Sequence, residues 1–588
     1  MRWAGVIDSV TRTVGGPKGR WAARPGRYRR WLVVAVVVAL LVQMAVAMVT
    51  TAVEQTPTID EPVYVGTAVD SLHHHRVRYN PEHPPLGKLI IAAGAALARP
   101  HLDAAFTGDQ TALGRQVLYA SGNDPWRLML CARLPMIALT LLFGLVVFAF
   151  ARELTGPVGG AVALALYTFS PDIVAHGSLA TLDVPAAGSL LTSVWLLWRA
   201  RRWPRRYLPL AGVALGAALA TKMSMLAAVP VLLLLAVLSV WYARGTNGRT
   251  PRGHARSLGI GVAAAVAVAL IAVAVVWAVY FLVDPRLRWT PTGPVPVVHG
   301  LRGLAVDLLP LPEAYRDGIR VQFGFEHDTW HGFLLGHRYL GSLWYYLPVA
   351  LLVKTPLGML ALWAAGTAVM LVVPRLRPAA PYVLIPAAVL LLAALIGARN
   401  LGVRYAIFLP MFLAVAAAGL MAVRRRWAYG ATPALVLFVA VSSLRTYPYY
   451  LSYSNEAFGG PSRTHLRLHD SNVDWGQDLG RLADRLRERY RGERIWLVYK
   501  GSGVPSAYGI HASDPRRARS EEVRGLLVVS DSSIAQATGR LAALIDGSEP
   551  IDEVGHSITL YRRWPPPPCH DISHTGRRRK GGVVPHSD

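Results

Sequence analysis

Carboxylate, imidazole and ammonium side chains are concentrated between Asp60 and Lys88, in the polar stretch that follows the first long apolar run. The stretch begins with the acidic pair Asp60-Glu61 and ends on a segment that contains Glu82 and Lys88. A carboxylate can remove the proton of an acceptor hydroxyl as a glycosidic bond forms, and a fixed cation can stabilise a leaving phosphate. These residue types beside an apolar run therefore predict chemistry on an anionic substrate that is carried by a lipid.

Each of these residues also has a simpler interpretation. Asp60-Glu61 could start an interfacial helix, and Lys88 could extend to lipid headgroups. The functional alternatives are a general base at Asp60, and a divalent cation held against a phosphate by Glu82 with an imidazole from a later loop. We interpret His73–His75 as a solvated face, because adjacent side chains do not converge on one metal ion.

The composition indicates a membrane protein. Of the 588 residues, 53% are hydrophobic and only 16% charged, with a mean hydropathy of +0.34, whereas soluble chains are about a quarter charged. Much of the net charge of +26 lies in short loops between apolar runs, and no basic stripe alternates with aromatic residues, which argues against nucleic-acid binding. Two cysteines, Cys131 and Cys569, are too few for a disulfide framework or a cysteine-rich metal site.

The positions of Lys and Arg predict the orientation of the chain. Residues 1–30 form a basic segment before the apolar run Trp31–Val49, so the N-terminus is predicted to be cytoplasmic and Asp60 to lie outside. Later basic stops agree with this orientation, and we predict about eleven spans over residues 31–446. The predicted external loops are 51–127 and 284–342. The remaining polar clusters, including Asp183 at the start of a span, then fall on the external face of a cytoplasmic (inner) membrane.

The composition changes again after residue 446. Strand-like segments at Ile495–Tyr499 and Leu526–Ser530 accompany a helical pattern at Leu479–Tyr490, which predicts a small extracytoplasmic α/β domain over residues 447–563. Residues 564–588, with four consecutive prolines and a basic run, are predicted to be a disordered tail. The predicted fold class is therefore an α-helical polytopic membrane protein with a small C-terminal α/β domain.

Several short motifs occur in an order that resembles a known family. They are Asp60-Glu61, Glu82 to Lys88, Pro171 to Asp183, Trp344 to Pro348 with Lys354-Thr355-Pro356, and Asn400 to Tyr405. Together they resemble the protein O-mannosyltransferase and lipid A aminoarabinose transferase relatives within the GT-C glycosyltransferases. The runs Asn455 to Pro461 and Asp470 to Asp478 look like the external domain of a bacterial subgroup. The resemblance covers roughly Trp31 to Arg563.

The resemblance implies an enzyme that transfers a sugar, with inversion, from a polyprenyl-phosphate donor to an acceptor glycan, lipid or protein outside the membrane. By position, Asp60 would be the base, Glu61 its neighbour at the acceptor and Asp183 the second acid. The candidate contacts of the donor phosphate are Lys88, Lys222, Lys354 and Arg404. Glu82 would be a metal or phosphate-site residue, with His337 as its partner and His327 as the alternative. No nucleotide cofactor is implied.

Two other classes of protein have some of the same features. A transporter or flippase of lipid-linked sugars would share a polar external cavity but would not need Asp60. Such a transporter is expected to bury its acids near the bilayer midplane, whereas these acids cluster at span ends and in loops. A membrane scaffold that presents residues 455–563 would not explain why polar residues gather on one side.

Overall fold

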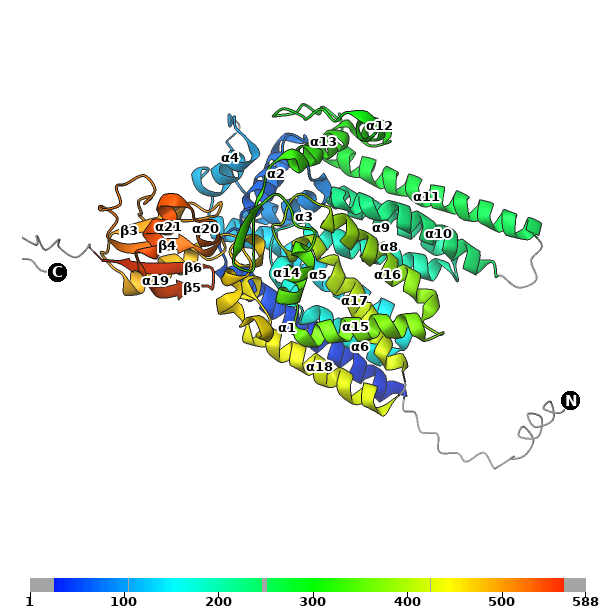
Figure 1. The fold of residues 1–588 in the computed structure, drawn as a ribbon. Helices are drawn as coiled ribbons and strands as arrows, with labels where there is room; N and C mark the ends of the chain where they lie inside the picture. Colours follow the sequence, from blue (N-terminus) through cyan, green and yellow to red (C-terminus); the bar gives the residue numbers. More distant parts are fainter. Residues whose placement is uncertain (1–25, 104, 246–250, 424, 565–588) are drawn as a thin grey trace, which may run out of the picture.

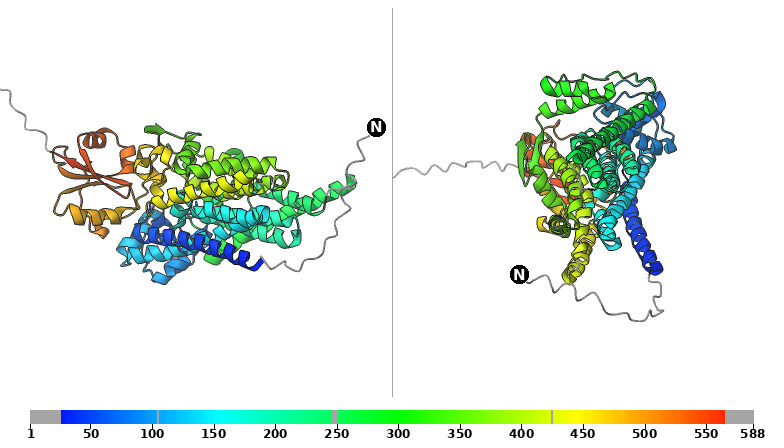
Figure 2. Two further views of the ribbon diagram at one scale, coloured as in Figure 1. Left: turned by 90° about the horizontal axis from the view of Figure 1, so that it is seen from below. Right: turned by 90° about the vertical axis from the view of Figure 1, so that its right-hand side faces the viewer.

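The computed structural model describes residues 26–103, 105–245, 251–423 and 425–564. It consists of an elongated helical body with a small α/β unit at one end (Figures 1 and 2). The predicted basic segment up to residue 25 and the predicted tail from residue 565 lie outside the described residues.

Long apolar helices form the body. Six of them could cross a membrane by length and composition: α1 (Gly26–Glu54), α5 (Pro125–Thr155), α10 (Val229–Ala243) with the turn before it, α11 (Pro251–Val283), α16 (Ala380–Leu395) with the turn before it, and α18 (Arg426–Arg445). Two bent pairs raise the number to eight if each counts as one span: α6 (Pro157–Thr168) with α7 (Pro171–Gly177), and α14 (Tyr346–Lys354) with α15 (Leu357–Val372). The predicted count of about eleven is not confirmed.

Shorter helices complete the body. They are α3 (Pro85–Ala95), α8 (Asp183–Ala200), α9 (Pro204–Thr221) and α17 (Phe408–Ala417). Helix α3 packs very closely on α5, because a Cβ at Gly94 would lie 2.1 Å from the carbonyl oxygen of Cys131. Helices α8 and α9 run side by side (Figure 1). The loop between them carries basic residues, while their other ends carry Asp183 and Lys222.

Smaller elements cover the end of the body where Asp60 lies. They are α2 (Glu61–His74), α4 (Gln110–Arg115), α12 (Gly300–Leu308), α13 (Glu313–His327) and a hairpin of β1 (His331–Leu334) and β2 (His337–Leu340). Pro62 in the first turn of α2 favours a helix start there, since its missing N–H would have no intrahelical partner. The chain therefore turns into α2 immediately after Asp60.

The α/β unit is built on a four-stranded sheet. Its strands are β3 (Ile495–Val498), β4 (Gly525–Ser530), β5 (Glu549–Val554) and β6 (Ile558–Arg563), in the order β3-β4-β6-β5 with only β3 and β4 parallel. Its helices are α19 (Leu479–Arg489), α20 (Asp531–Ala535) and α21 (Gly539–Asp546). Helix α19 buries Leu479, Leu482 and Leu486 in the core on one side of the sheet, and Trp496 belongs to the core on the other side.

An irregular segment joins the body to this unit. Between α18 and α19 the chain forms only short 3-10 turns, yet residues 468–480 are all buried. Two backbone hydrogen bonds connect it to the loop before α2: Thr56 N–H donates to Gln477 O, and Ile59 N–H donates to Trp475 O, both at 2.9 Å. The loop that carries Asp60 is thus held from the C-terminal side of the chain.

Candidate active site

Glu61 is the first residue of α2, and its carboxylate is fully buried. One oxygen accepts hydrogen bonds from Arg133 Nε at 2.8 Å and from the N–H of Ala180 at 2.7 Å. The other accepts from Arg133 Nη2 at 2.7 Å and from the N–H and hydroxyl of Thr58 at 2.9 and 3.1 Å. Burial alone would raise the pKa of Glu61, but Arg133 and these hydrogen bonds outweigh it, so the pKa is lowered. Both oxygens are occupied, so Glu61 has the contacts of a residue that fixes the loop.

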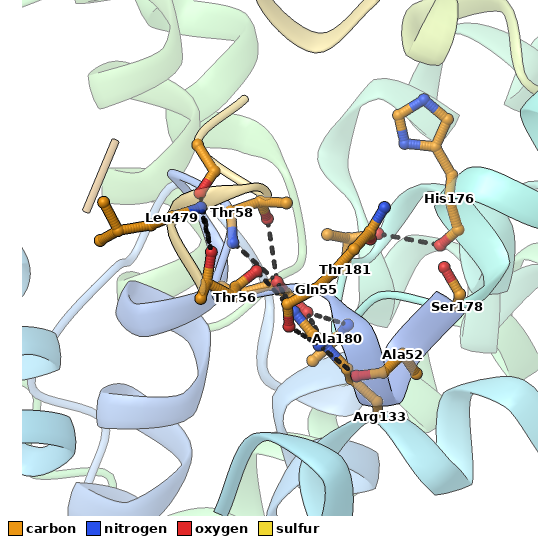
Figure 3. Close-up of polar contacts among 12 residues, drawn as sticks. Ala52, Gln55, Thr56, Thr58, Arg133, His176, Ser178, Ala180, Thr181 and Leu479 are labelled. Carbon is orange, nitrogen blue, oxygen red and sulfur yellow. Dashed lines mark hydrogen bonds and ion pairs between the residues drawn. The ribbon is translucent and has the colours of Figure 1, made fainter. Parts of the chain in front are cut away.

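Arg133, which the sequence reasoning did not identify, completes this buried pair. It lies within α5 with 0% exposure, and its Nη1 donates to the carbonyl oxygens of Ala52 and Gln55, both at 2.7 Å. Figure 3 shows Arg133 directed at the chain between Ala52 and Thr58. A signal was present, because an arginine inside an apolar run costs about 2.5–3.5 kcal/mol at a helix centre and therefore needs an acidic partner.

Asp60 directly precedes Glu61 but has a different environment. Its Oδ2 lies 2.5 Å from Arg404 Nη1, and its side chain is 27% exposed. Although Asp60 occupies the N-cap position of α2, its side chain makes no capping hydrogen bond. The helix-cap interpretation therefore does not account for this carboxylate, which keeps an accessible oxygen beside a guanidinium group.

Tyr64, one helical turn after Asp60 on α2, marks the centre of the acidic cluster. Burial raises its pKa well above the ordinary value, and the nearby charges of Asp60, Asp183 and Glu82 raise it further, while Arg404 opposes them. Three predicted carboxylates from three separate segments thus interact electrostatically with one phenol. The (i, i+4) spacing from Asp60 was a usable signal for Tyr64.

Asp183 and Lys222 form a second ion pair. Lys222 Nζ donates to Asp183 Oδ1, and the two side chains are 14% and 4% exposed. Lys222 lies in extended backbone directly after α9, and its Nζ is 5.7 Å from the ring centroid of Tyr405. Electrostatic interactions also connect Asp183 with Arg404. The structure therefore brings Asp60, Asp183, Lys222 and Arg404 together.

Glu82 and Lys88 are joined through Asn80 instead. Glu82 Oε1 accepts hydrogen bonds from Asn80 Nδ2 and Gln110 Nε2, both at 2.8 Å. Lys88 Nζ donates to the carbonyl oxygen of Asn80 at 2.8 Å and is only 4% exposed. Lys88 therefore does not extend to lipid headgroups, and its ammonium group supports the loop between α2 and α3.

Histidines near Glu82 do not supply a ligand set. His337 and His327 are exposed on β2 and at the end of α13, and no contact of either with Glu82 is present. In the described ranges, no group of three or more His, Cys, Asp or Glu side chains could hold a metal ion. His83 is half-buried, and desolvation together with the charges of Lys222 and Lys88 lowers its pKa well below the usual value, which disfavours its charged form. We assign no reaction step to a metal ion. The predicted metal at Glu82 stays a prediction, which activity after chelation of the purified protein would test.

Lys354 is also engaged by the protein itself. Its side chain is 1% exposed, and Nζ donates to the carbonyl oxygens of Leu451 at 2.7 Å and Asn472 at 2.8 Å, with Asp172 Oδ1 at 3.8 Å. Lys354 therefore attaches the segment after α18 to α14. Among the predicted phosphate contacts, Lys222 and Arg404 are the two that border the acidic cluster.

Comparison with known proteins agrees with the motifs. Residues 36–284 match the family model described as dolichyl-phosphate-mannose-protein mannosyltransferase. This match confirms the resemblance to the protein O-mannosyltransferase-like glycosyltransferases over that stretch. The matched stretch includes α5, α10 with the turn before it, and α11, which are long and apolar enough to cross a membrane. No curated protein matches the chain.

Several solved structures are also similar to this chain. Apo ArnT from Cupriavidus metallidurans is 15% identical, with 91% of this chain and 98% of that chain covered and a TM-score of 0.45. The Pmt1–Pmt2 complex of S. cerevisiae bound to the sugar donor is 18% identical, with 43% and 33% covered and a TM-score of 0.33. The apo oligosaccharyltransferase of Archaeoglobus fulgidus is 13% identical, with 78% and 58% covered and a TM-score of 0.40.

Proposed function

We propose that this protein transfers a sugar from a polyprenyl-phosphate donor to an acceptor hydroxyl on the outer face of the cytoplasmic membrane. The observation that carries the proposal is the partly exposed carboxylate of Asp60 beside Arg404, with the Asp183–Lys222 pair next to it. A partly exposed carboxylate and two cations are groups that can serve an inverting transfer from a phosphate. The name of the matched family supports a polyprenyl-phosphate donor.

In the proposed reaction, Asp60 acts on the acceptor, and Arg404 and Lys222 act on the donor phosphate. Asp60 accepts the proton of the acceptor hydroxyl. At the same time, the oxygen of that hydroxyl bonds to the anomeric carbon from the face opposite the phosphate. The bond between that carbon and the phosphate oxygen breaks, and its electron pair leaves with polyprenyl phosphate. Arg404 can hold the phosphate in a bidentate manner, and Lys222 adds a second positive charge. Asp183 keeps Lys222 in place through their ion pair.

Buried residues around the cluster position it. Glu61 and Arg133 fix the chain before α2, Lys354 fixes the segment after α18, and Lys88 supports the loop before α3. The positions of the basic stops support an orientation in which the cluster lies outside the membrane.

The test is sugar transfer by the purified full chain in proteoliposomes supplied with a panel of polyprenyl-phosphate sugars. Asp60→Asn is expected to lower the rate of transfer by about 10²–10⁴-fold, whereas Asp109→Asn should keep it. Asp109 is a matched control, because it is an exposed N-cap of α4 in the same outer region, and asparagine caps equally well. Normal transfer by Asp60→Asn would refute the base assignment. Lipid movement without any transfer by the wild type would favour the transporter interpretation instead.

A further inference from the structure

The ten residues Asp470–Leu479, here named the docking segment, are buried between the helical body and the α/β unit. The segment contains three acids, and all three are used within the protein. Asp470 pairs with Lys500 at 2.7 Å, Asp474 accepts from the N–H groups of Gly476 and Ser532, and Asp478 pairs with Arg481. These contacts account for the three buried carboxylates, so a bound cation is not needed to explain why they lie there.

The docking segment touches both loops of the proposed active site. On the Asp60 side, Trp475 O and Gln477 O accept the backbone hydrogen bonds from Ile59 and Thr56. On the Arg404 side, Asn472 Oδ1 accepts from the N–H of Val403 at 3.0 Å, and Ser471 Oγ donates to Leu401 O at 2.6 Å. Approach is very close here, because a Cβ at Gly402 would lie 2.1 Å from Ser471 Oγ.

Trp475 is the residue of the docking segment whose side chain contacts Arg404 of the proposed site. Its side chain is 1% exposed, and its ring centroid lies 4.4 Å from Arg404 Cζ. The ring of Tyr405 lies 5.3 Å from the same carbon, so aromatic faces constrain the guanidinium group. Arg404 Nε is buried without a hydrogen-bond partner, and Nη1 binds Asp60. The guanidinium plane of Arg404 is therefore set by stacking on the aromatic rings rather than by a set of hydrogen bonds.

We infer that Trp475 is a positioning residue for the donor phosphate and that the docking segment completes the transferase site. This inference rests on the proposed function, because it assigns Arg404 to the phosphate. The plane of a guanidinium group decides whether two of its nitrogens can meet two phosphate oxygens. Trp475 holds that plane while Nη1 stays on Asp60, so the base and the phosphate site share one support.

The experiment measures binding of undecaprenyl phosphate to the full chain in nanodiscs, and the KM of transfer for the lipid donor and for the acceptor. Trp475→Leu is expected to weaken lipid binding about tenfold and to raise the donor KM by a similar factor, with the acceptor KM unchanged. Trp475→Phe keeps an aromatic face and should restore most of the affinity. Partial unfolding, in contrast, would lower the active fraction and kcat without changing either KM.

Trp496→Leu is the matched control. Trp496 is also 1% exposed and also has an arginine stacked on it, with Arg494 Cζ 4.3 Å from its ring centroid, but it belongs to the core of the α/β unit. Its substitution should leave lipid affinity at the wild-type value. Equal affinity of Trp475→Leu and wild type, or an equal loss in both leucine variants, would overturn the inference alone. Absence of lipid binding by the wild type would overturn the proposed function and this inference together.

Discussion

Two adjacent carboxylates, those of Asp60 and Glu61, are each paired with an arginine but in opposite ways. Glu61 is 0% exposed and has both oxygens saturated by Arg133 and three further donors. Asp60 is 27% exposed and touches one nitrogen of Arg404. A saturated buried pair resists change, whereas an unsaturated carboxylate can accept a proton from a substrate. The side chain next in sequence to the proposed base is therefore the one that fixes the loop that carries it.

The largest effect is expected when the unsaturated member is changed. Asp60→Asn should lower kcat by about 10²–10⁴-fold, the usual contribution of a general base. The midpoint of unfolding by SDS titration should stay near the wild-type value, since the fold gains only one contact from this carboxylate. Steady-state transfer assays and unfolding curves on the same preparation check both statements. If Asp60→Asn lost stability as well as activity, Asp60 would be a structural residue like Glu61, and the contrast between the two would be wrong.

Glu61→Gln should have the opposite profile. It leaves Arg133 buried without its counter-charge, which typically costs about 3–5 kcal/mol of the free energy of unfolding. The double variant Glu61→Gln with Arg133→Met should lose less than the sum of the two single changes. The control is Glu153→Gln, because Glu153 and Arg199 pair at 3.0 Å with each side chain 31% exposed. Such a pair contributes about 0–1 kcal/mol. Equal losses at Glu61 and Glu153 would contradict the interpretation.

Asp531 is a third carboxylate for this comparison. It is buried like that of Glu61, but its hydrogen-bond donor is a hydroxyl group rather than an arginine. Thr559 Oγ1 donates to its Oδ1 at 2.7 Å, while Oδ2 is buried without a hydrogen-bond partner and lies 3.8 Å from His465 Nδ1. Burial first, and then the charge of Glu553, raises its pKa from 3.8 to about 7. The folded protein therefore binds this proton more tightly than the unfolded chain does. Stability of the α/β unit should fall as pH rises from about 4 to about 7, by up to about 1.4 kcal/mol per pH unit.

Asp531→Asn should remove the part of that dependence that comes from Asp531, because an amide does not titrate and its nitrogen can occupy the position of Oδ2. The buried Asp474, whose pKa burial and the charge of Asp531 also raise to about 7, should keep a part of its own. Hydrogen exchange of the β4 amides at pH 5 and 7.5, corrected for the intrinsic exchange rate, measures the change. Asp546→Asn, at an exposed carboxylate, is the control and should keep the wild-type slope. An unchanged slope in Asp531→Asn would show that another group titrates.

The smallest effect is expected for Arg404→Lys. Lysine keeps the positive charge beside Asp60 but loses the planar fork and the stacking on Trp475. We expect the donor KM to rise about fivefold, or roughly 1 kcal/mol, while the acceptor KM stays constant. Kinetics with each substrate varied in turn distinguish the two constants. A rise confined to the acceptor KM would move Arg404 to the acceptor side.

The sequence contained enough information for the main parts of the site. Asp60, Asp183, Lys222 and Arg404 follow or precede apolar runs, and alternation of basic stops predicted that they share one side. The partners of Glu61 and Lys354 were not predictable, since Arg133 is 72 residues from Glu61 and Asn472 is 118 residues from Lys354. Such pairs depend on which helices pack together, and residue type alone does not specify this.

Other differences have equally local reasons. The predicted count of about eleven spans is not confirmed within the described residues, where α6 with α7 and α14 with α15 form pairs bent by 63° and 117° at a break, and where residues 408–422 form a shorter apolar helix. His337 was selected for its position before an aromatic motif, but it begins β2, whose pairing with β1 leaves the imidazole exposed. A short hairpin of this kind has no signature in residue spacing that distinguishes it from an irregular loop.

The docking segment also has a consequence for biosynthesis. The chain is made from its N-terminus, so Asp60, Asp183 and Arg404 and every apolar helix are synthesised before Trp475. The last support of the site is thus among the late residues to leave the ribosome. A nascent chain whose helices are still entering the bilayer is expected to be inactive toward the lipids around it, and it acquires activity only when its C-terminal part folds back onto the loops that came first.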